Sequence, residues 1–263
     1  MKGDLSISRG RDRLIFNHLR IILDGLMRKI GFSTGALAYS DFRKALKMLE
    51  KHSTPAVELS ALRKHELLPL LDALNNLDLR RFSFISVHAP SDVSKDDEAF
   101  LVKLLGSVTQ RGWPVVVHPD SIHDPACWHV LGSLLCIENM DNRKPMGRNR
   151  DELSRLFDKL PGASLCLDLG HSRQIDPTMG EARLILRDLG NRLKEVHLSE
   201  VDSLGKHGRI SRDSILAFRG VAGLIPEGVP IILESVVLED QIFGELEAAR
   251  SVLELPPFFG REP

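Results

Sequence analysis

Residues 134–168 read LLCIENMDNRKPMGRNRDELSRLFDKLPGASLCLD, and this stretch contains the unit from which the fold is built. It holds two short apolar runs, 134–138 and 164–168, with a segment of helical period at 149–160 between them. Apolar runs of this length, separated by amphipathic helices, are typical of parallel strands that are covered on both faces. The stretch therefore predicts a strand, a helix and a second, parallel strand.

The same unit recurs along the chain. The remaining short apolar runs lie at 29–33, 56–59, 82–88, 115–118, 195–198 and 231–234. Segments of helical period separate them, at 40–51, 62–77, 96–111, 124–131, 180–191, 212–224 and 239–253. From Glu58 onward, the polar residues that end successive strands are 30, 30, 20, 30, 29 and 37 residues apart, and one strand–helix unit takes about 30 residues. Eight units in a row predict a (β/α)8 TIM barrel, which is an eight-stranded parallel barrel with outer helices.

An open, doubly wound α/β sheet is the alternative fold for such a pattern. It would usually carry a glycine-rich phosphate fingerprint after its first strand, and 31–35 (GFSTG) does not match GxGxxG. We therefore assign 29–255 to the barrel, 1–28 to an N-terminal extension and 256–263 to a C-terminal tail. Residues 12–26 could form one amphipathic helix that covers the bottom of the barrel, or an extension without a role, and the sequence leaves both open.

The composition excludes several classes of function. Apolar residues make up 43% of the 263 residues and charged residues 27%, which is ordinary for a soluble, folded domain. The net charge of −1 gives no global positive field to attract nucleic acid, and fourteen aromatic residues are few for base stacking. Three cysteines without CxxC spacing fit a reducing cytoplasm, and no apolar run approaches the roughly 20 residues of a membrane span. A cytoplasmic enzyme or binding module is expected, in an oligomeric state that the composition leaves open.

Polar residues of similar chemistry end seven of the eight predicted strands. They are Glu58, His88, His118, Glu138, Asp168, His197 and Glu234, and the loops that follow two of these strands add His171 and His207. In a TIM barrel the carboxyl ends of the strands form the catalytic face, so these side chains should converge. A single histidine or glutamate at a strand end is usually a hydrogen-bonded structural residue, but seven together indicate a divalent metal site. We expect one to three ions of Zn²⁺, Mn²⁺ or Mg²⁺.

Basic residues lie in two loops at the same face. The loop 143–150 (RKPMGRNR) follows the fifth strand, and the loop after the seventh strand adds Lys206, Arg209 and Arg212. Such a cluster could hold a phosphate group, or it could be solvated loop charge, and the sequence does not separate the two. The residues that we expect to contact substrate are Glu58, Asn139, Arg143 and Lys206.

The strand-end motifs resemble those of the xylose isomerase-like TIM-barrel superfamily. This group contains the sugar phosphate isomerases and epimerases and the endonuclease IV-type nucleases, AP endonuclease family 2. The matching motifs, in chain order, are His88-Ala-Pro, Val117-His118-Pro, Glu138-Asn139, Asp168-Leu-Gly-His171, His197-Leu-Ser-Glu200 and Leu233-Glu234. The resemblance covers about residues 29–255, and the order and spacing of the motifs are specific.

The resemblance implies metal ligands and further roles. A central ion, which both branches of the superfamily share, would be bound by Glu138, Asp168, His197 and Glu234. A second ion, as in the nucleases, would be bound by His88, His118 and the bridging Glu138. His171 and His207 would belong to a third ion in a nuclease, whereas His171 would contact substrate in an epimerase.

The chain departs from both branches at three places. Nucleases of this group carry an aspartate two residues before the histidine of the seventh loop, where this chain has Gly205. They also carry bulky residues that wedge into DNA after the third-strand motif, where this chain has Ser91 and Asp92. Ketose epimerases carry an arginine soon after the seventh-strand motif, where this chain has Ser203.

The leading hypothesis is a divalent-metal-dependent sugar or sugar-phosphate isomerase/epimerase that acts by proton transfer through a metal-stabilised enediolate. Glu138 and Glu234 would be its base and acid, and His171 would hydrogen-bond a substrate oxygen. The alternative is an endonuclease IV-like, zinc-dependent phosphodiester hydrolase that acts on abasic DNA, and a third interpretation is a metal- or sugar-binding barrel without catalysis. The expected partner is a small-molecule sugar or sugar phosphate, with nucleic acid disfavoured.

Overall fold

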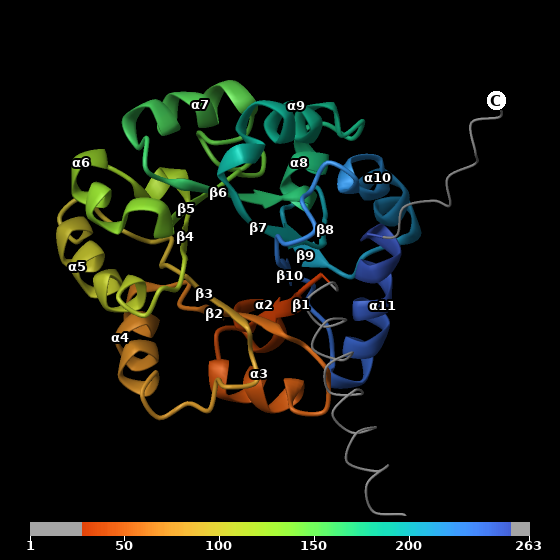
Figure 1. Ribbon diagram of the computed structural model, residues 1–263, viewed down its shortest axis with the longest axis horizontal. Coiled ribbons are helices and arrows are strands. Elements are labelled where there is room, and N and C mark those ends of the chain that lie inside the picture. The colour runs from red at the N-terminus through yellow and green to blue at the C-terminus, as the bar shows by residue number, and fades with distance from the viewer. Residues whose placement is uncertain (1–27, 254–263) are drawn as a thin grey trace, which may run out of the picture.

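Eight parallel strands close into a barrel in the computed structural model, which describes residues 28–253 (Figure 1). The strands follow one another around the barrel in chain order, and the last pairs with the first. They are β1 (Ile30–Ser33), β2 (Ala56–Ser60), β3 (Phe84–His88), β4 (Val115–Val117), β5 (Leu135–Glu138), β6 (Ser164–Asp168), β7 (Leu193–Leu198) and β10 (Ile231–Leu233). Every strand expected from the sequence is present, and the (β/α)8 TIM barrel is confirmed.

Longer helices cover the outside of the barrel (Figure 1). They are α3 (Phe42–Leu49), α4 (Lys64–Ala73), α5 (Glu98–Thr109), α7 (Arg150–Lys159), α9 (Gly180–Leu189), α10 (Arg212–Ala222) and α11 (Ile242–Leu253). Short polar side chains begin several of these helices by accepting a backbone N–H of the first turn. Asp41 does so for α3, Asn149 for α7 and Ser211 for α10.

The segment 124–131 does not form the single helix that its sequence predicts. It contains one helical turn, α6 (Pro125–Trp128), followed by a 3₁₀ segment, His129–Leu134. Gly132 interrupts that segment with a φ of 56°, a conformation that residues with a Cβ rarely adopt. Only 20 residues separate His118 from Glu138, so this unit has too little chain for a full outer helix.

The rim of the barrel mouth carries elements that the sequence pattern does not predict. Two short helices, α2 (Thr34–Ala38) and α8 (Leu169–Ile175), follow β1 and β6 directly. The loop after β7 forms an antiparallel hairpin of β8 (Glu200–Val201) and β9 (His207–Gly208). A 3₁₀ turn at Pro119–Ser121 follows β4, whereas the turns at Gly190–Arg192 and Glu239–Gln241 lie directly before β7 and α11. These elements matter for the site, because α8 carries His171 and the hairpin carries His207.

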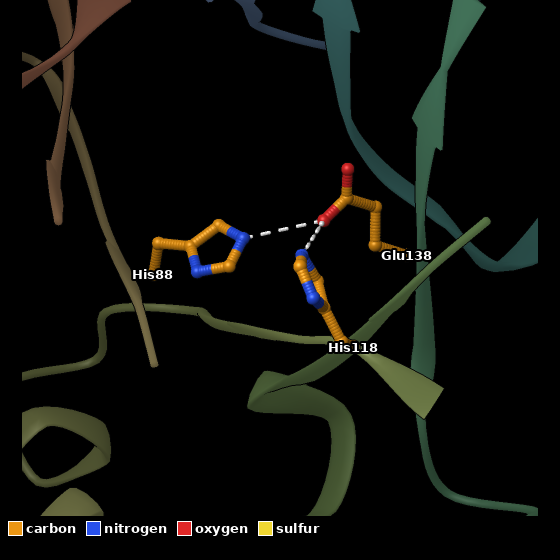
Figure 2. A group of neighbouring side chains, drawn as sticks. All are labelled: His88, His118 and Glu138. Atoms are coloured by element: carbon orange, nitrogen blue, oxygen red, sulfur yellow. Dashed lines mark hydrogen bonds and ion pairs between the residues drawn. The ribbon is translucent and has the colours of Figure 1, made fainter. Parts of the chain in front are cut away.

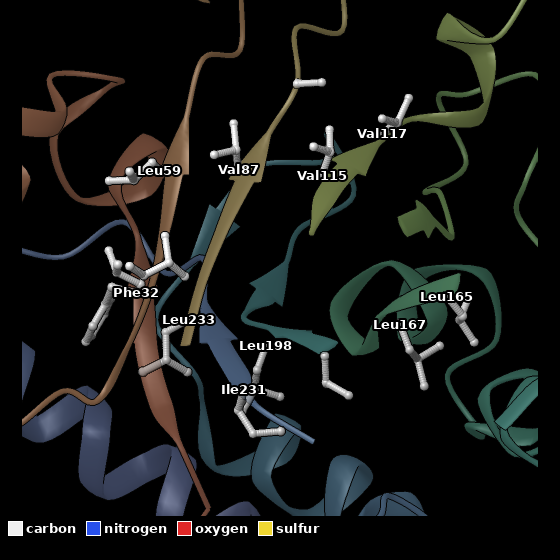
Figure 3. Packing of buried hydrophobic residues seen from close by; sticks show 14 of the residues in the cluster. Phe32, Leu59, Val87, Val115, Val117, Leu165, Leu167, Leu198, Ile231 and Leu233 are labelled. Carbon is white, nitrogen blue, oxygen red and sulfur yellow. The ribbon is translucent and has the colours of Figure 1, made fainter. Parts of the chain in front are cut away.

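The strands send apolar side chains outward and small or polar side chains inward, because alternate residues of a strand point to opposite sides. Val115 and Val117 belong to the main hydrophobic core between the strands and the helices (Figure 3). Val116, between them, packs instead with Cys136 and Cys166 in a separate small cluster. The main core is therefore the layer outside the barrel, and the barrel interior is left for small and polar side chains.

Some of the sequence predictions lie outside the described residues. These are the helix at 12–26, nearly all of the extension 1–28, and the tail 256–263. Within the described range, the elements of the barrel run from Ile30 to Leu253. No helix of that range is long and apolar enough to cross a membrane.

Gly31 is expected to be required for barrel closure. It pairs with Ala56 across β1 and β2, and a Cβ at Gly31 would lie 1.8 Å from the Ala56 carbonyl oxygen. Gly31→Ala should push the two strands apart and lower the free energy of unfolding by about 3 kcal/mol or more. Gly106→Ala in α5 is the matched control, because an added Cβ there meets no atom within 4 Å, and it should raise the free energy by about 0.5–1 kcal/mol. Urea denaturation followed by circular dichroism measures both, and equal stabilities would contradict the expected clash.

Candidate metal centre

The polar residues at the strand ends converge at the carboxyl end of the barrel. They form three overlapping groups, and within each group the ligand atoms all lie within 4.8 Å of one another. The outer group is His88, His118 and Glu138; the central group is Glu138, Asp168, His197 and Glu234; the loop group is Asp168, His171 and His207. Glu138 joins the outer group to the central group, and Asp168 joins the central group to the loop group. The structure thus brings together all eight residues that the sequence motifs propose as ligands.

Glu138 ends β5, and both of its carboxylate oxygens face imidazole rings. Oε2 lies 3.2 Å from His88 Nε2 and 3.3 Å from His118 Nε2 (Figure 2). Oε1 lies 3.4 Å from His171 Nδ1 and 3.5 Å from His197 Nδ1. One buried carboxylate therefore has imidazoles on both sides, which suits a carboxylate that bridges two cations.

The outer group is oriented by the backbone of β3. His88 Nδ1 lies 2.8 Å from the carbonyl oxygen of Ala89, so Nδ1 donates its proton there and Nε2 faces Glu138. Burial lowers the pKa of His88, but the hydrogen bond to Glu138 and the charges of nearby glutamates outweigh it and raise that pKa to about 9. For His118, burial outweighs the attraction of Glu138, and its pKa is lowered. With no ion bound, a proton on His88 therefore takes the place of a cation at neutral pH.

The central group holds two carboxylates with different surroundings. Asp168 caps α8, where its Oδ1 accepts the N–H of His171, and its buried Oδ2 has no hydrogen-bond partner among the described residues. Burial raises the pKa of Asp168 to about 6, against the opposing charges of His171 and His207. Glu234 Oε1 lies 3.6 Å from His197 Nδ1. Burial raises the pKa of Glu234, but the charges of His197 and His207 outweigh it and leave the pKa below its usual range.

The loop group depends on the two rim elements that the sequence does not predict. His171, on α8, donates from Nδ1 to the carbonyl oxygen of Asn139 at 2.9 Å. His207, on β9, lies with Nδ1 2.8 Å from Ser199 Oγ and 3.4 Å from Glu234 Oε2. The two imidazole rings meet edge to face with centroids 5.2 Å apart. The hairpin therefore returns His207 to the mouth, although it is ten residues beyond His197 in the chain.

The donors of this centre fit divalent cations. Asp168 Oδ2 and His197 Nδ1 are buried and lack a hydrogen-bond partner within residues 28–253. Buried carboxylates without donors or cations are costly, and Glu138, Asp168 and Glu234 lie within one group. A set of carboxylate oxygens and imidazole nitrogens without thiolate suits Zn²⁺ or Mn²⁺. The centre therefore has the ligand types and the negative charge that such ions need.

Two of the residues expected to contact substrate lie beneath the mouth. The sequence pattern ends the second strand at 59, but β2 continues to Ser60, and Glu58 points into the barrel with its Oε2 3.1 Å from His197 Nε2. Asn139 connects β5 to β6, because its side chain accepts the N–H of Asp168 and donates to the carbonyl oxygen of the same residue. Both side chains are fully buried.

The other two, Arg143 and Lys206, lie in the loops over the mouth. Arg143 Nε donates to Asp141 Oδ2 at 2.8 Å, and half of the arginine side chain is exposed. A Cβ on Gly205 would lie 2.0 Å from Arg143 Nε, so the guanidinium occupies the space that a side chain at 205 would take. Lys206 is exposed on the same hairpin. Both cations are therefore within reach of a ligand that enters from solvent.

Two buried carboxylates beside the centre are absent from the strand-end pattern. Glu195 lies on β7 two residues before His197, and its Oε1 is 3.5 Å from His197 Nε2. The alternation of strand residues could have placed it on the same side as His197. Asp141 lies in the loop after β5, and its Oδ2 is 3.9 Å from His171 Nε2. A loop has no periodicity, so nothing in the sequence marks Asp141.

Comparison with known proteins supports the fold. No protein-family model and no curated protein matches the sequence. Among solved structures, an endonuclease IV from Thermus thermophilus superposes with a TM-score of 0.58 at 19% sequence identity, over 87% of this chain and 100% of that one. The crystal structure of AsfvAP:AG superposes with a TM-score of 0.55 at 13% identity, over the same shares of the two chains. The chain shares a TIM-barrel fold with these two structures.

Glu138→Gln should remove more bound metal than His88→Ala. Glu138 belongs to both the outer and the central group, whereas His88 belongs to the outer group alone. The amide keeps the shape of the side chain but loses its charge, and both variants should remain folded because rim residues contribute little to the core. Elemental analysis gives the metal content, and circular dichroism checks the fold. A wild-type metal content in folded Glu138→Gln would refute the bridging position.

The affinity of the outer group for metal should rise with pH between about 6 and 9. His88 belongs to this group, has a pKa of about 9 and must lose a proton to bind an ion. Affinity should therefore increase by up to about tenfold per pH unit up to pH 9 and then level off. Calorimetric Zn²⁺ titrations in two buffers of different ionisation enthalpy measure the number of protons released on binding. If no proton is released at pH 7, the raised pKa of His88 is contradicted.

Proposed function

We propose that the protein hydrolyses a phosphate ester with a cluster of divalent ions, and that Zn²⁺ is the metal. The observation that carries this proposal is Glu138, which presents one oxygen to His88 and His118 and the other to His197. The enediolate mechanism described above uses one ion beside the substrate, and the central group would suffice for it. The outer group is a second complete set of donors, which a two-ion hydrolase requires.

The residues of the chain divide the work of such a reaction. When bound, the ions polarise the phosphoryl oxygen and make water more acidic. Asp168 and Glu138 hold the groups together because each belongs to two of them. Arg143, held in place by Asp141, would bind a phosphoryl oxygen with the face of its guanidinium that remains exposed. Lys206 would add a second positive charge from the hairpin.

The substrate class that we propose is a small phosphodiester or sugar phosphate. The fold likeness to endonuclease IV makes a phosphodiester the first class to test. The net charge of −1 and the Ser91-Asp92 pair after β3 disfavour duplex DNA. A cytoplasmic location accords with three cysteines that are all free.

A sugar-phosphate isomerase or epimerase is the second candidate. Glu138 Oε1 and Glu234 Oε1 lie 3.5 and 3.6 Å from the same atom, His197 Nδ1. Two carboxylates that flank one ligand of the central group could act as the base and the acid of a proton transfer. His171 would then hydrogen-bond a substrate oxygen.

The two candidates differ in the bond that breaks. Zn²⁺-loaded protein should hydrolyse a nitrophenyl phosphate diester or monoester, and should not exchange the C–H protons of aldose and ketose phosphates with deuterated water. Asp168→Asn should lower the hydrolysis rate by at least about 100-fold. Arg143→Ala should raise KM more than it lowers kcat, whereas Lys103→Ala, an exposed lysine on the outer helix α5, should change neither.

If the protein exchanges the C–H protons of the sugar phosphates and hydrolyses neither ester, the isomerase replaces the hydrolase as the proposed function. Efficient cleavage of an abasic-site duplex at physiological salt would keep the hydrolase and change its substrate to DNA. If protein that carries its full metal content catalyses neither reaction, both candidates are refuted.

A further inference from the structure

A layer of buried polar residues lies directly beneath the metal centre, inside the barrel. Glu58 on β2, Glu195 on β7 and Cys166 on β6 are completely buried, as is His197, which reaches from the centre into this layer. His197 Nε2 lies 3.1 Å from Glu58 Oε2 and 3.5 Å from Glu195 Oε1. The reaction proposed above uses neither glutamate.

The two glutamates do not stabilise the barrel through hydrogen bonds. Within the described residues no aligned hydrogen bond reaches any of their four carboxylate oxygens, and the polar groups that face them are His197 Nε2 and, for Glu195, the Ser86 hydroxyl. Buried carboxylates without donors oppose folding. Glu98 shows the contrast, because its buried carboxylate accepts the N–H groups of His123 and Asp124 and the indole N–H of Trp128. Glu58 and Glu195 therefore need an explanation other than stability.

Their position determines which nitrogen of His197 can bind an ion. Nε2 faces the two carboxylates, and a lone pair there would point into negative charge, so Nε2 carries the proton. Nδ1 faces Glu138 and Glu234 of the central group, at 3.5 and 3.6 Å. The ring can thus present its lone pair only toward the centre.

We propose that Glu58 is a positioning residue, which holds His197 from beneath with its proton on Nε2 and Nδ1 free, and thereby sets the affinity of the central group for its ion. Glu195 supports the same orientation from the neighbouring strand at the longer distance. A carboxylate behind a metal-binding histidine increases the basicity of the ring and fixes its orientation, and losing it typically weakens metal binding by about 10- to 100-fold. This inference rests on the metal centre of the proposed function and is independent of the reaction.

A metal ion inside the barrel is the competing explanation, because Cys166, Glu195 and His197 have ligand atoms within 4.8 Å of one another. His197 would then have to bind ions through both nitrogens at once, because its Nδ1 faces the central group. Cys166→Ser tests this alternative directly.

The experiment measures Zn²⁺ binding to the central group alone. In a His88→Ala/His207→Ala background, which keeps the four central ligands, Zn²⁺ affinity is determined by competition with a chelator. Glu58→Leu should weaken binding by about 10- to 100-fold, and Glu58→Gln, which keeps an acceptor oxygen, should lose clearly less. The melting temperature of metal-free Glu58→Leu should stay the same or rise, because a buried carboxylate that accepts no aligned hydrogen bond is replaced by an apolar side chain.

Glu98→Gln is the matched control, since it also neutralises a buried glutamate. It should lower the melting temperature, because Glu98 accepts hydrogen bonds from three donor groups, and leave Zn²⁺ affinity unchanged. The proposal is overturned if Glu58→Leu leaves the Zn²⁺ affinity unchanged. It is also overturned if Glu58→Leu lowers both the affinity and the melting temperature. If the metal content of Cys166→Ser is lower than that of the parent protein, the proposal is replaced by an ion buried inside the barrel. A background protein that binds no Zn²⁺ even with Glu58 intact would refute the central metal site itself.

Discussion

The contact of one buried carboxylate with four imidazoles is the interaction on which the centre depends. Glu138 Oε2 meets His88 and His118, while Oε1 meets His171 and His197, each within 3.5 Å. These rings come from β3, the end of β4, α8 and β7, so a single side chain at the end of β5 connects elements on several sides of the barrel. Removing solvent from such a set is favourable only when positive charge is present, as protons or as metal ions. The need for cations thus follows from the packing of the barrel mouth.

The alternation of strand residues makes this centre compatible with a stable fold. Apolar residues such as Val115 and Val117 point outward to the helices, where the main core lies, and the interior receives Val116, Cys136 and Cys166 together with the polar set. Barrel stability comes from the outer layer, so the interior can accept residues that oppose folding. Glu58 and Glu195 are the extreme case, since they are buried without donors directly beneath His197.

The loops give the centre features that belong to this chain. Arg143 lies where a side chain of residue 205 would be, which only a glycine at that position permits, and Asp141 anchors it. Nucleases that the motifs resemble carry an aspartate at this position. Here the carboxylate near His171 comes from Asp141, and an exposed guanidinium lies at the mouth. This exchange of a carboxylate for a guanidinium places a partly exposed positive charge beside the centre.

The sequence by itself determined the barrel and the polar residues that gather at its mouth from the strand ends, because both follow the strand repeat. Runs of apolar residues about 30 residues apart, each ending in a histidine or a carboxylate, place Glu138, Asp168 and His197 at one end of a parallel barrel. Only the tertiary structure decided the positions of Glu58, Asp141 and Arg143. The predicted strand ends at 59, one residue past Glu58, but β2 continues to Ser60 and Glu58 is fully buried inside the barrel. Asp141 and Arg143 lie in a loop, where contacts across space rather than a repeating backbone geometry determine where a side chain points.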